Sequence, residues 1–257
     1  MINEYAVDPR IVSSWERLQR LLSQFGFDKH RLIARVPGRW RSAVLESLPQ
    51  SLGDTERSRI VARLKDFENL TMVARPHTWD SKDDWIQNVL RIHTSDNFAM
   101  ILTANGAEMC PPIVPYAELD ESTPPPGWLV SGRVERSRDG LVKALRLVLQ
   151  SAKKVAKFVE PHFDSDKTRF SNAFAAYLSC ICSCNPVAAF PVIELHTSDK
   201  HEGKCFREKC QQFFSSRLPR GSKLRVIRWP GHRMHNRYVV TEKACVILGV
   251  GTDVSFR

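Results

Sequence analysis

The sequence predicts an α/β protein (α+β overall) in which a mainly helical N-terminal module precedes an α/β sheet domain. Apolar residues recur at helical spacing through the first part of the chain, until a Pro-rich stretch interrupts the pattern. From about Ser137 onward, apolar runs and amphipathic stretches follow the order β-α-β-α-β-β-β, which is typical of a sheet covered by helices. We therefore expect a helical module over 1–110, a linker over 111–135 and an α/β domain over 136–257.

The expected helices of the N-terminal module are indicated by their first residues. Asp8 and Pro9 place a capping acid before a proline, and apolar residues then recur at helical spacing until Gly26. The segment Ser81-Lys82-Asp83-Asp84 resembles a capping box ahead of a later helix. The other elements expected in this module are helices from Pro37 and after Asp54 and a strand over Phe98–Thr103.

Prolines are concentrated between the two expected domains, at Pro111-Pro112, Pro115 and Pro124-Pro125-Pro126. Proline lacks a backbone N–H and clashes inside a helix, so such a run forbids helices and central strands. The stretch is therefore expected to be a linker or an extended crossing segment.

The second half alternates helices and strands. Each predicted strand is a short run of β-branched, aromatic or other apolar residues, bounded by turn-forming residues. The expected helices are Leu141–Leu149, Phe170–Leu178 and Lys204–Phe214, and the expected strands are Val155–Glu160, Val192–Thr197, Leu224–Trp229, Asn236–Thr241 and Cys245–Leu248.

The excess of positive over negative charge is confined to the second half of the chain. Residues 1–130 carry 15 Lys and Arg against 17 Asp and Glu, whereas residues 131–257 carry 23 against 11. The first part is therefore −2 and the second part +12, which together give the net charge of +10. A basic field of this size attracts polyanions, so the asymmetry points towards nucleic acid, the alternative being a solvated basic surface.

The compartment is predicted from what the sequence lacks. No apolar run approaches the length of about 18 residues that a membrane span requires, and the N-terminal residues do not resemble a secretory signal. Seven cysteines show no C-x2-C pair, and Cys180, Cys182 and Cys184 are expected to be small apolar residues near a helix end. We expect a cytoplasmic protein without membrane contact.

A histidine and a cation stand two residues apart near the end of the chain, in His235-Asn236-Arg237. Side chains alternate along a strand, so His235 and Arg237 are expected on the same face. Glu242 follows five residues after the arginine, and a glycine turn with small polar residues begins at Gly249. The arrangement suits a site that holds a phosphate while an imidazole attacks it.

This segment resembles the signature of the phospholipase D superfamily, H-x-K-x4-D-x6-G-S-x-N, with every spacing kept. The matching residues are, in order, His235, Arg237, Glu242, Gly249 and Thr252. The likeness covers about 140–257, where the order of helices and strands is also similar to a phospholipase D half-domain. It implies the fold of that superfamily for the C-terminal domain.

The resemblance also implies a role for each residue. His235 would be the nucleophile that forms a phosphohistidine intermediate, and Glu242 would orient a histidine and stabilise its charged form. Arg237 would grip two phosphate oxygens with its planar fork, assisted by Gly249 and by Thr252 or its neighbour Asp253. The route needs no metal and no cofactor.

The motif departs from the signature at three positions. Arg237 replaces lysine and Glu242 replaces aspartate, both with the charge kept, whereas Val250 replaces a serine and loses its hydroxyl. Weaker nucleic-acid-binding candidates stand at strand ends or beside the motif, where they are placed to contact phosphates or stack on a base. They are His162, His196, Arg228, Trp229, His232 and Arg233.

The sequence thus predicts a metal-independent phosphodiesterase, a nuclease similar to phospholipase D-like proteins of bacterial antiphage defence. A catalytically inactive nucleic-acid-binding or assembly subunit of the same fold is the first alternative, and a lipid phosphodiesterase is the second. Only one copy of the motif is present, so the acid that protonates the leaving oxygen is expected from a second chain in a homodimer. The chain ends four residues after Asp253, which indicates a fragment or a fold completed by another polypeptide in a larger complex.

Overall fold

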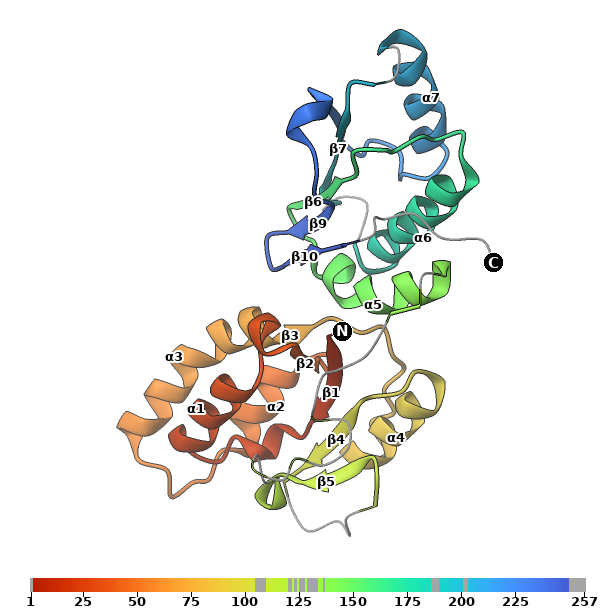
Figure 1. Cartoon of the computed structure of the whole chain (residues 1–257). Coiled ribbons are helices and arrows are strands. Elements are labelled where there is room, and N and C mark those ends of the chain that lie inside the picture. The colour runs from red at the N-terminus through yellow and green to blue at the C-terminus, as the bar shows by residue number, and fades with distance from the viewer. Residues whose placement is uncertain are drawn as a thin grey trace. The chain divides into compact units, whose positions relative to one another are not determined.

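The computed structural model describes residues 2–104, 110–119, 122, 124, 128, 134–135, 137–185, 190–200 and 203–249. The chain forms two compact units, Met1–Gly132 and Arg133–Arg257. Each contains a five-stranded sheet with its own helices (Figure 1). The α/β class predicted from the sequence is therefore confirmed, and it holds for both units.

The N-terminal unit is built on a parallel sheet in the order β3-β2-β1-β4-β5. Its strands are β1 (Asn3–Val7), β2 (Arg31–Ala34), β3 (Met72–Val73), β4 (Met100–Thr103) and β5 (Ile113–Pro115). This order reverses between β1 and β4, as it does in doubly wound α/β folds.

Helices cover both faces of this sheet. They are α1 (Trp15–Gln24), α2 (Trp40–Ser47), α3 (Asp54–Thr71) and α4 (Trp85–Ser95). Successive residues of β1 enter different cores because strand side chains alternate: Tyr5 and Val7 pack with residues of α1, α2 and α3, whereas Ala6 packs with residues of α4. Within the first core, the buried Trp40 indole N–H donates to the carbonyl of Val7 at 2.8 Å.

The predicted helices of this unit are present, with two changes in their caps. Asp8 caps only a short 3₁₀ turn, Pro9–Ile11, and α1 begins later with its own cap at Ser14. The capping box of α4 joins Asp84 to Gln87 and does not start at Ser81. The sequence predicted a mainly helical module with a few strands, and the structure shows that five short strands form a parallel sheet between these helices.

The predicted linker over 111–135 begins inside the N-terminal unit. Among the described residues, Ile113–Pro115 is the edge strand β5, and a proline is tolerated there because an edge strand pairs on one side only. Trp128 is 2% exposed and packs edge-on against Tyr5 and Phe25, while the Arg31 guanidinium lies 4.3 Å from its ring centroid. The division between the units follows Gly132.

The C-terminal unit has a mixed sheet in the order β10-β9-β6-β7-β8. β6, β7 and β8 are parallel, β9 is antiparallel to β6, and β10 is antiparallel to β9. The strands are β6 (Val155–Val159), β7 (Val192–Ser198), β8 (Leu224–Trp229), β9 (Tyr238–Thr241) and β10 (Cys245–Ile247), and the helices are α5 (Arg138–Ser151), α6 (Thr168–Cys184) and α7 (Gly203–Ser215). All elements predicted for this half are confirmed, with ends that differ by a few residues.

The helices of this unit pack on one face of its sheet (Figure 1). Phe158 of β6 contacts Phe174 and Tyr177 of α6, and alternate residues of β8, in register with Phe158, face α7. The opposite face carries Lys157, Val159, Glu194, His196, Arg225, Ile227, Trp229, Tyr238, Val240, Cys245 and Ile247, as the strand register requires. We call it the open face, because Ile247 is 70% and Trp229 41% exposed.

Within the described parts of the chain, no helix is both long enough and apolar enough to span a membrane.

Truncation of Trp128 tests whether the end of the Pro-rich stretch belongs to the N-terminal core. We expect Trp128→Ala to lower the free energy of unfolding by about 3–5 kcal/mol, because a fully buried aromatic side chain is removed. Urea unfolding followed by circular dichroism measures the change. Val134→Ala is the control, since Val134 is 40% exposed and its truncation should cost less than about 0.5 kcal/mol. Equal effects of the two substitutions would contradict the assignment.

Candidate functional site

Most of the predicted site residues lie at one edge of the C-terminal sheet. The parallel strands β6, β7 and β8 all end there, and β9 starts there because it runs antiparallel to β6. His196 lies near the end of β7, Trp229 ends β8, and His235 precedes β9 in a segment without regular secondary structure. We call this side of the sheet the His235 edge.

A pocket of about 420 Å³ opens at the His235 edge. Its lining combines two imidazoles, an indole, a guanidinium, an amide and a phenol, which are groups suited to phosphates and bases. The lining residues are Val159, His196, Trp229, Arg233, Met234, His235, Asn236 and Tyr238. The structure thus brings together four predicted residues, His196, Trp229, Arg233 and His235.

Trp229 and His196 are joined by a hydrogen bond. The Trp229 indole N–H donates to His196 Nδ1 at 3.1 Å, and the two ring planes are inclined by only 15°. Since indole nitrogen only donates, Nδ1 accepts, and the ring proton of neutral His196 is on Nε2. Nε2 lies 3.5 Å from Oε2 of Glu194, so both ring nitrogens of His196 are engaged.

Glu194 connects the Trp229–His196 pair to cations on the two neighbouring strands. Lys157 Nζ lies 3.1 Å from Oε2, and Arg225 donates to Oε1 at 3.0 Å. Burial acts to raise the pKa of Glu194, but the bonds from Lys157, Arg225 and His196 outweigh it and hold the pKa below its ordinary value of 4.5. Glu194 is therefore a carboxylate at neutral pH, and it fixes His196 in place.

Arg237 lies beside a buried acid. Its Nε is 3.5 Å from Oε1 of Glu160, which is 1% exposed and follows the last residue of β6. Glu160 also accepts the backbone N–H of His162 at 3.2 Å. Arg237 does not line the pocket that contains His235. The Arg237 guanidinium thus forms an ion pair between the segment before β9 and the end of β6, and its predicted contact with a phosphate stays a prediction.

The other motif residues divide between the two ends of β9. Glu242 follows β9 at the end away from His235, and its carboxylate accepts the backbone N–H groups of Lys153 at 2.6 Å and Lys154 at 3.3 Å. Its role is therefore to cap the start of β6, and it is too far along the strand to orient His235. Gly249 follows β10 at the His235 edge, where Leu248 N–H donates to the carbonyl of Arg237 at 2.9 Å. Thr252, Asp253 and the substituted Val250 lie outside the described residues.

The weaker candidates have separate positions. His162 follows β6 at the His235 edge and is exposed. Arg228 points to the helix-covered face, where it donates to the carbonyl of Asp199 at 2.8 Å and lies over the Phe206 ring. His232 and Arg233 form a short 3₁₀ turn after β8, and of these two only Arg233 lines the pocket.

Sequence reasoning missed Asn236 and Tyr238 in the pocket lining, as well as the two acids that organise it, Glu160 and Glu194. The sequence does contain a signal from which Glu194 could have been predicted. Glu194 and His196 stand two apart within an apolar strand, so they had to share a face that is not a hydrophobic core.

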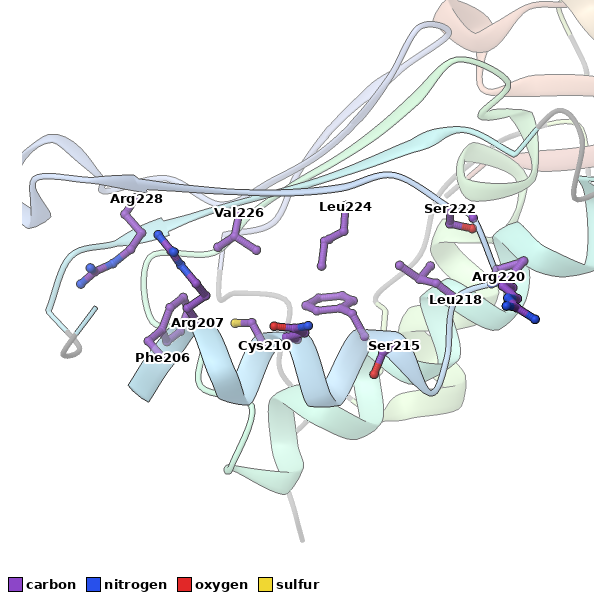
Figure 2. A pocket seen from close by; sticks show the side chains of 14 residues that line it. Phe206, Arg207, Cys210, Ser215, Leu218, Arg220, Ser222, Leu224, Val226 and Arg228 are labelled. Carbon is purple, nitrogen blue, oxygen red and sulfur yellow. The ribbon is translucent and has the colours of Figure 1, made fainter. Parts of the chain in front are cut away.

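A larger cavity of about 900 Å³ lies between α7 and β8, on the helix-covered face. Figure 2 shows Leu224 and Val226 directed from β8 towards α7, with Arg228 at one end of the cavity and Arg220 at the other. Burial raises the pKa of Cys210, which lines it, to about 12, so the thiol stays protonated and is a poor nucleophile. The described residues that line this cavity include three arginines but no histidine, so they do not supply the predicted nucleophile.

No model of a known protein family matches the chain, and no curated protein matches it. The phospholipase D resemblance therefore stays a prediction from the motif residues. Over the described residues, no group of three His, Cys, Asp or Glu side chains converges as a metal site would require.

Neutralisation of Glu194 should destabilise the C-terminal unit in a pH-dependent manner. Its pKa is lowered by folding, so its contribution is present above the ordinary pKa of 4.5 and is lost as the pH falls through the folded value. We expect Glu194→Gln to cost about 2 kcal/mol at pH 7, as charged hydrogen bonds typically contribute, and much less near pH 3.

Urea unfolding at a series of pH values measures this difference. Glu208→Gln removes the same charge from an exposed position of α7 and should have little effect at any pH. A cost of Glu194→Gln that did not change with pH would contradict the role given to its carboxylate.

Proposed function

We propose that the C-terminal unit is a metal-independent phosphodiesterase that acts on nucleic acid, with His235 as its nucleophile. The observation that supports this function is the position of His235 in a polar, aromatic pocket at the His235 edge. The excess of positive charge in residues 131–257 favours a polyanionic substrate. The spacing of the motif from His235 to Gly249 is also that of the phospholipase D signature.

The phosphate is held by groups that line the pocket. Arg233 and Asn236 flank His235 there and are exposed, so both can reach a phosphodiester from solvent. Arg237 acts one step away: its contact with Glu160 anchors the backbone that carries His235. In this proposal Arg233 therefore binds the phosphate oxygens, a role that the motif assigns to the Arg237 guanidinium.

The reaction proceeds in two displacements. A neutral ring nitrogen of His235 forms a bond to phosphorus, the bond to the leaving oxygen breaks, and that oxygen takes a proton from a general acid. Water then attacks the phosphohistidine and gives its proton to the deprotonated general acid, the P–N bond breaks, and both His235 and the acid are restored. Arg233 neutralises charge on the non-bridging oxygens in both steps.

The general acid is not His196. Its Nδ1 accepts from Trp229 and its Nε2 lies against Glu194, so neither nitrogen is directed to a leaving group. A second copy of His235, supplied by another chain in a homodimer, remains our proposal for this acid. Light scattering of the purified protein tests the dimer, and a monomer with full activity would contradict it.

A nucleic-acid-binding subunit without catalysis is the second candidate. It is favoured by the contacts of Arg237 with Glu160 and of Glu242 with the start of β6, which give structural roles to two of the three predicted catalytic residues. The pocket and the basic charge would then serve binding alone.

Replacement of His235 separates these two functions. In buffer with EDTA, we expect the protein to cleave labelled single-stranded DNA or RNA, and His235→Ala to reduce the rate at least ~10³-fold, as loss of a nucleophile does. His30→Asn is the control, because His30 is an exposed residue of the N-terminal unit with φ of 56°, which asparagine adopts readily. Binding without cleavage by the wild type would support the second candidate, and cleavage confined to phospholipid vesicles would contradict both.

The two arginines of this segment should respond differently to substitution. We expect Arg233→Ala to weaken binding of all sequences and to reduce the slope of log K against log salt by about 1, with an unchanged melting temperature. Arg237→Ala should lower the melting temperature, because it removes a charged partner of the buried Glu160. Fluorescence anisotropy measures binding and thermal melting measures stability. Weaker binding on Arg237→Ala together with a lower melting temperature on Arg233→Ala would indicate that Arg237, and not Arg233, contacts the phosphate.

A further inference from the structure

We infer that the open face binds an unpaired base on a flat surface formed by Trp229 and His196. The preferred ligand of the C-terminal unit is then single-stranded nucleic acid. This inference rests on the proposed function, because it names the form of nucleic acid that the His235 pocket receives.

The Trp229 indole and the His196 imidazole lie side by side in nearly the same plane. The N–H of an indole lies in its ring plane, and the lone pair of Nδ1 lies in the plane of the imidazole. A bond of 3.1 Å between these groups, with planes inclined by 15° and centroids 6.2 Å apart, therefore sets the rings edge to edge. The combined surface is wider than either ring, which suits the π-face of a base.

This surface is held in position before any ligand arrives. His196 is fixed by Glu194, and Glu194 is held by Lys157 and Arg225 from the neighbouring strands β6 and β8. Trp229 is fixed in turn by its bond to His196. A rigid aromatic surface loses little conformational entropy on binding, so the stacking energy is kept as affinity.

Its surroundings favour a nucleotide over an apolar partner. Trp229 is 41% exposed although it ends a strand, and it shares a pocket with Arg233, His235 and Asn236. A base on the rings would therefore place its phosphates next to cationic and hydrogen-bonding groups. An apolar peptide would leave those groups desolvated without partners.

The base must be unpaired. In a duplex both faces of each base are covered by its neighbours, and a side chain on a sheet face cannot enter the stack without separating them. A single strand presents its bases freely, and open sheets with exposed aromatic side chains bind such strands by stacking.

A comparison of oligonucleotides that differ only in their bases tests the inference. The experiment uses the full chain with His235→Ala, because this substitution prevents turnover. Anisotropy reports its affinity for labelled oligo-dT, for an abasic strand of equal length and for a fully paired duplex without a loop. We expect oligo-dT to bind about 10-fold more tightly than the abasic strand, from stacking of a single base. The duplex should bind no better than the abasic strand.

Added substitutions assign the effect to the rings. Trp229→Ala should reduce the affinity for oligo-dT to that for the abasic strand, whereas Trp229→Phe should keep most of the preference because the π-face remains. His196→Ala should reduce the preference several-fold. Ile247→Ala is the matched control, since Ile247 is an exposed apolar residue of the same face on the far edge strand and should not change it.

The possible results distinguish this inference from the proposed function. Equal affinity for oligo-dT and the abasic strand, or a preference that survives Trp229→Ala, overturns the stacking surface and leaves cleavage by His235 unaffected. Base-dependent binding by a wild-type protein that cleaves nothing supports the stacking surface and contradicts the phosphodiesterase. Tighter binding of the duplex than of oligo-dT also overturns the inference.

Discussion

The antiparallel pairing of β9 with β6 determines where the candidate chemistry lies. β6, β7 and β8 are parallel, so their carboxyl ends meet at one edge of the sheet, and only an antiparallel neighbour begins at that edge. His235, just before β9, therefore joins the ends of β7 and β8, where His196 and Trp229 lie. A parallel β9 would place His235 beside the start of β6 and Glu242 at the pocket. The register Val159↔Tyr238 thus sets which residues of the motif can act together.

Two buried acids determine which cations of the basic C-terminal unit are paired with a carboxylate. Glu160 forms an ion pair with Arg237, and Glu194 forms ion pairs with Lys157 and Arg225. Three cations near the pocket therefore have carboxylate partners. Each acid is nearly inaccessible, and ionised carboxylates can be buried only with such partners. The consequence for function is a separation of roles. The paired cations neutralise the buried acids, and Arg233, which is exposed, is the cation to which we assign the proposed phosphate contact.

The elements of the C-terminal unit could be predicted because its sheet is open on one side. Strands such as Val192–Ser198 alternate core residues with polar ones, and this period of two appears in the sequence. The N-terminal strands lack that signal, because both faces of a parallel sheet are covered and strands such as Met72–Val73 are too short to show a pattern. The place of His235 just before β9 could be predicted because the apolar run of that strand follows it in the sequence. The contacts of Arg237 and Glu242 could not, because local spacing does not show which distant backbone or acid a long side chain will reach.

The doubly wound order of the N-terminal sheet does not by itself assign that unit a phosphate ligand. In such sheets ligands bind where the strand order reverses, which here is between the ends of β1 and β4. The residue after β1 is the buried Asp8, whose carboxylate accepts from the Arg10 backbone N–H at 2.9 Å and from its guanidinium at 2.7 Å. A carboxylate therefore occupies the position where a glycine-rich turn would present free N–H groups to a phosphate. Residues 1–130 are also net negative. Neither feature favours a polyanion in the N-terminal unit, so our proposal of nucleic-acid chemistry is confined to the C-terminal unit.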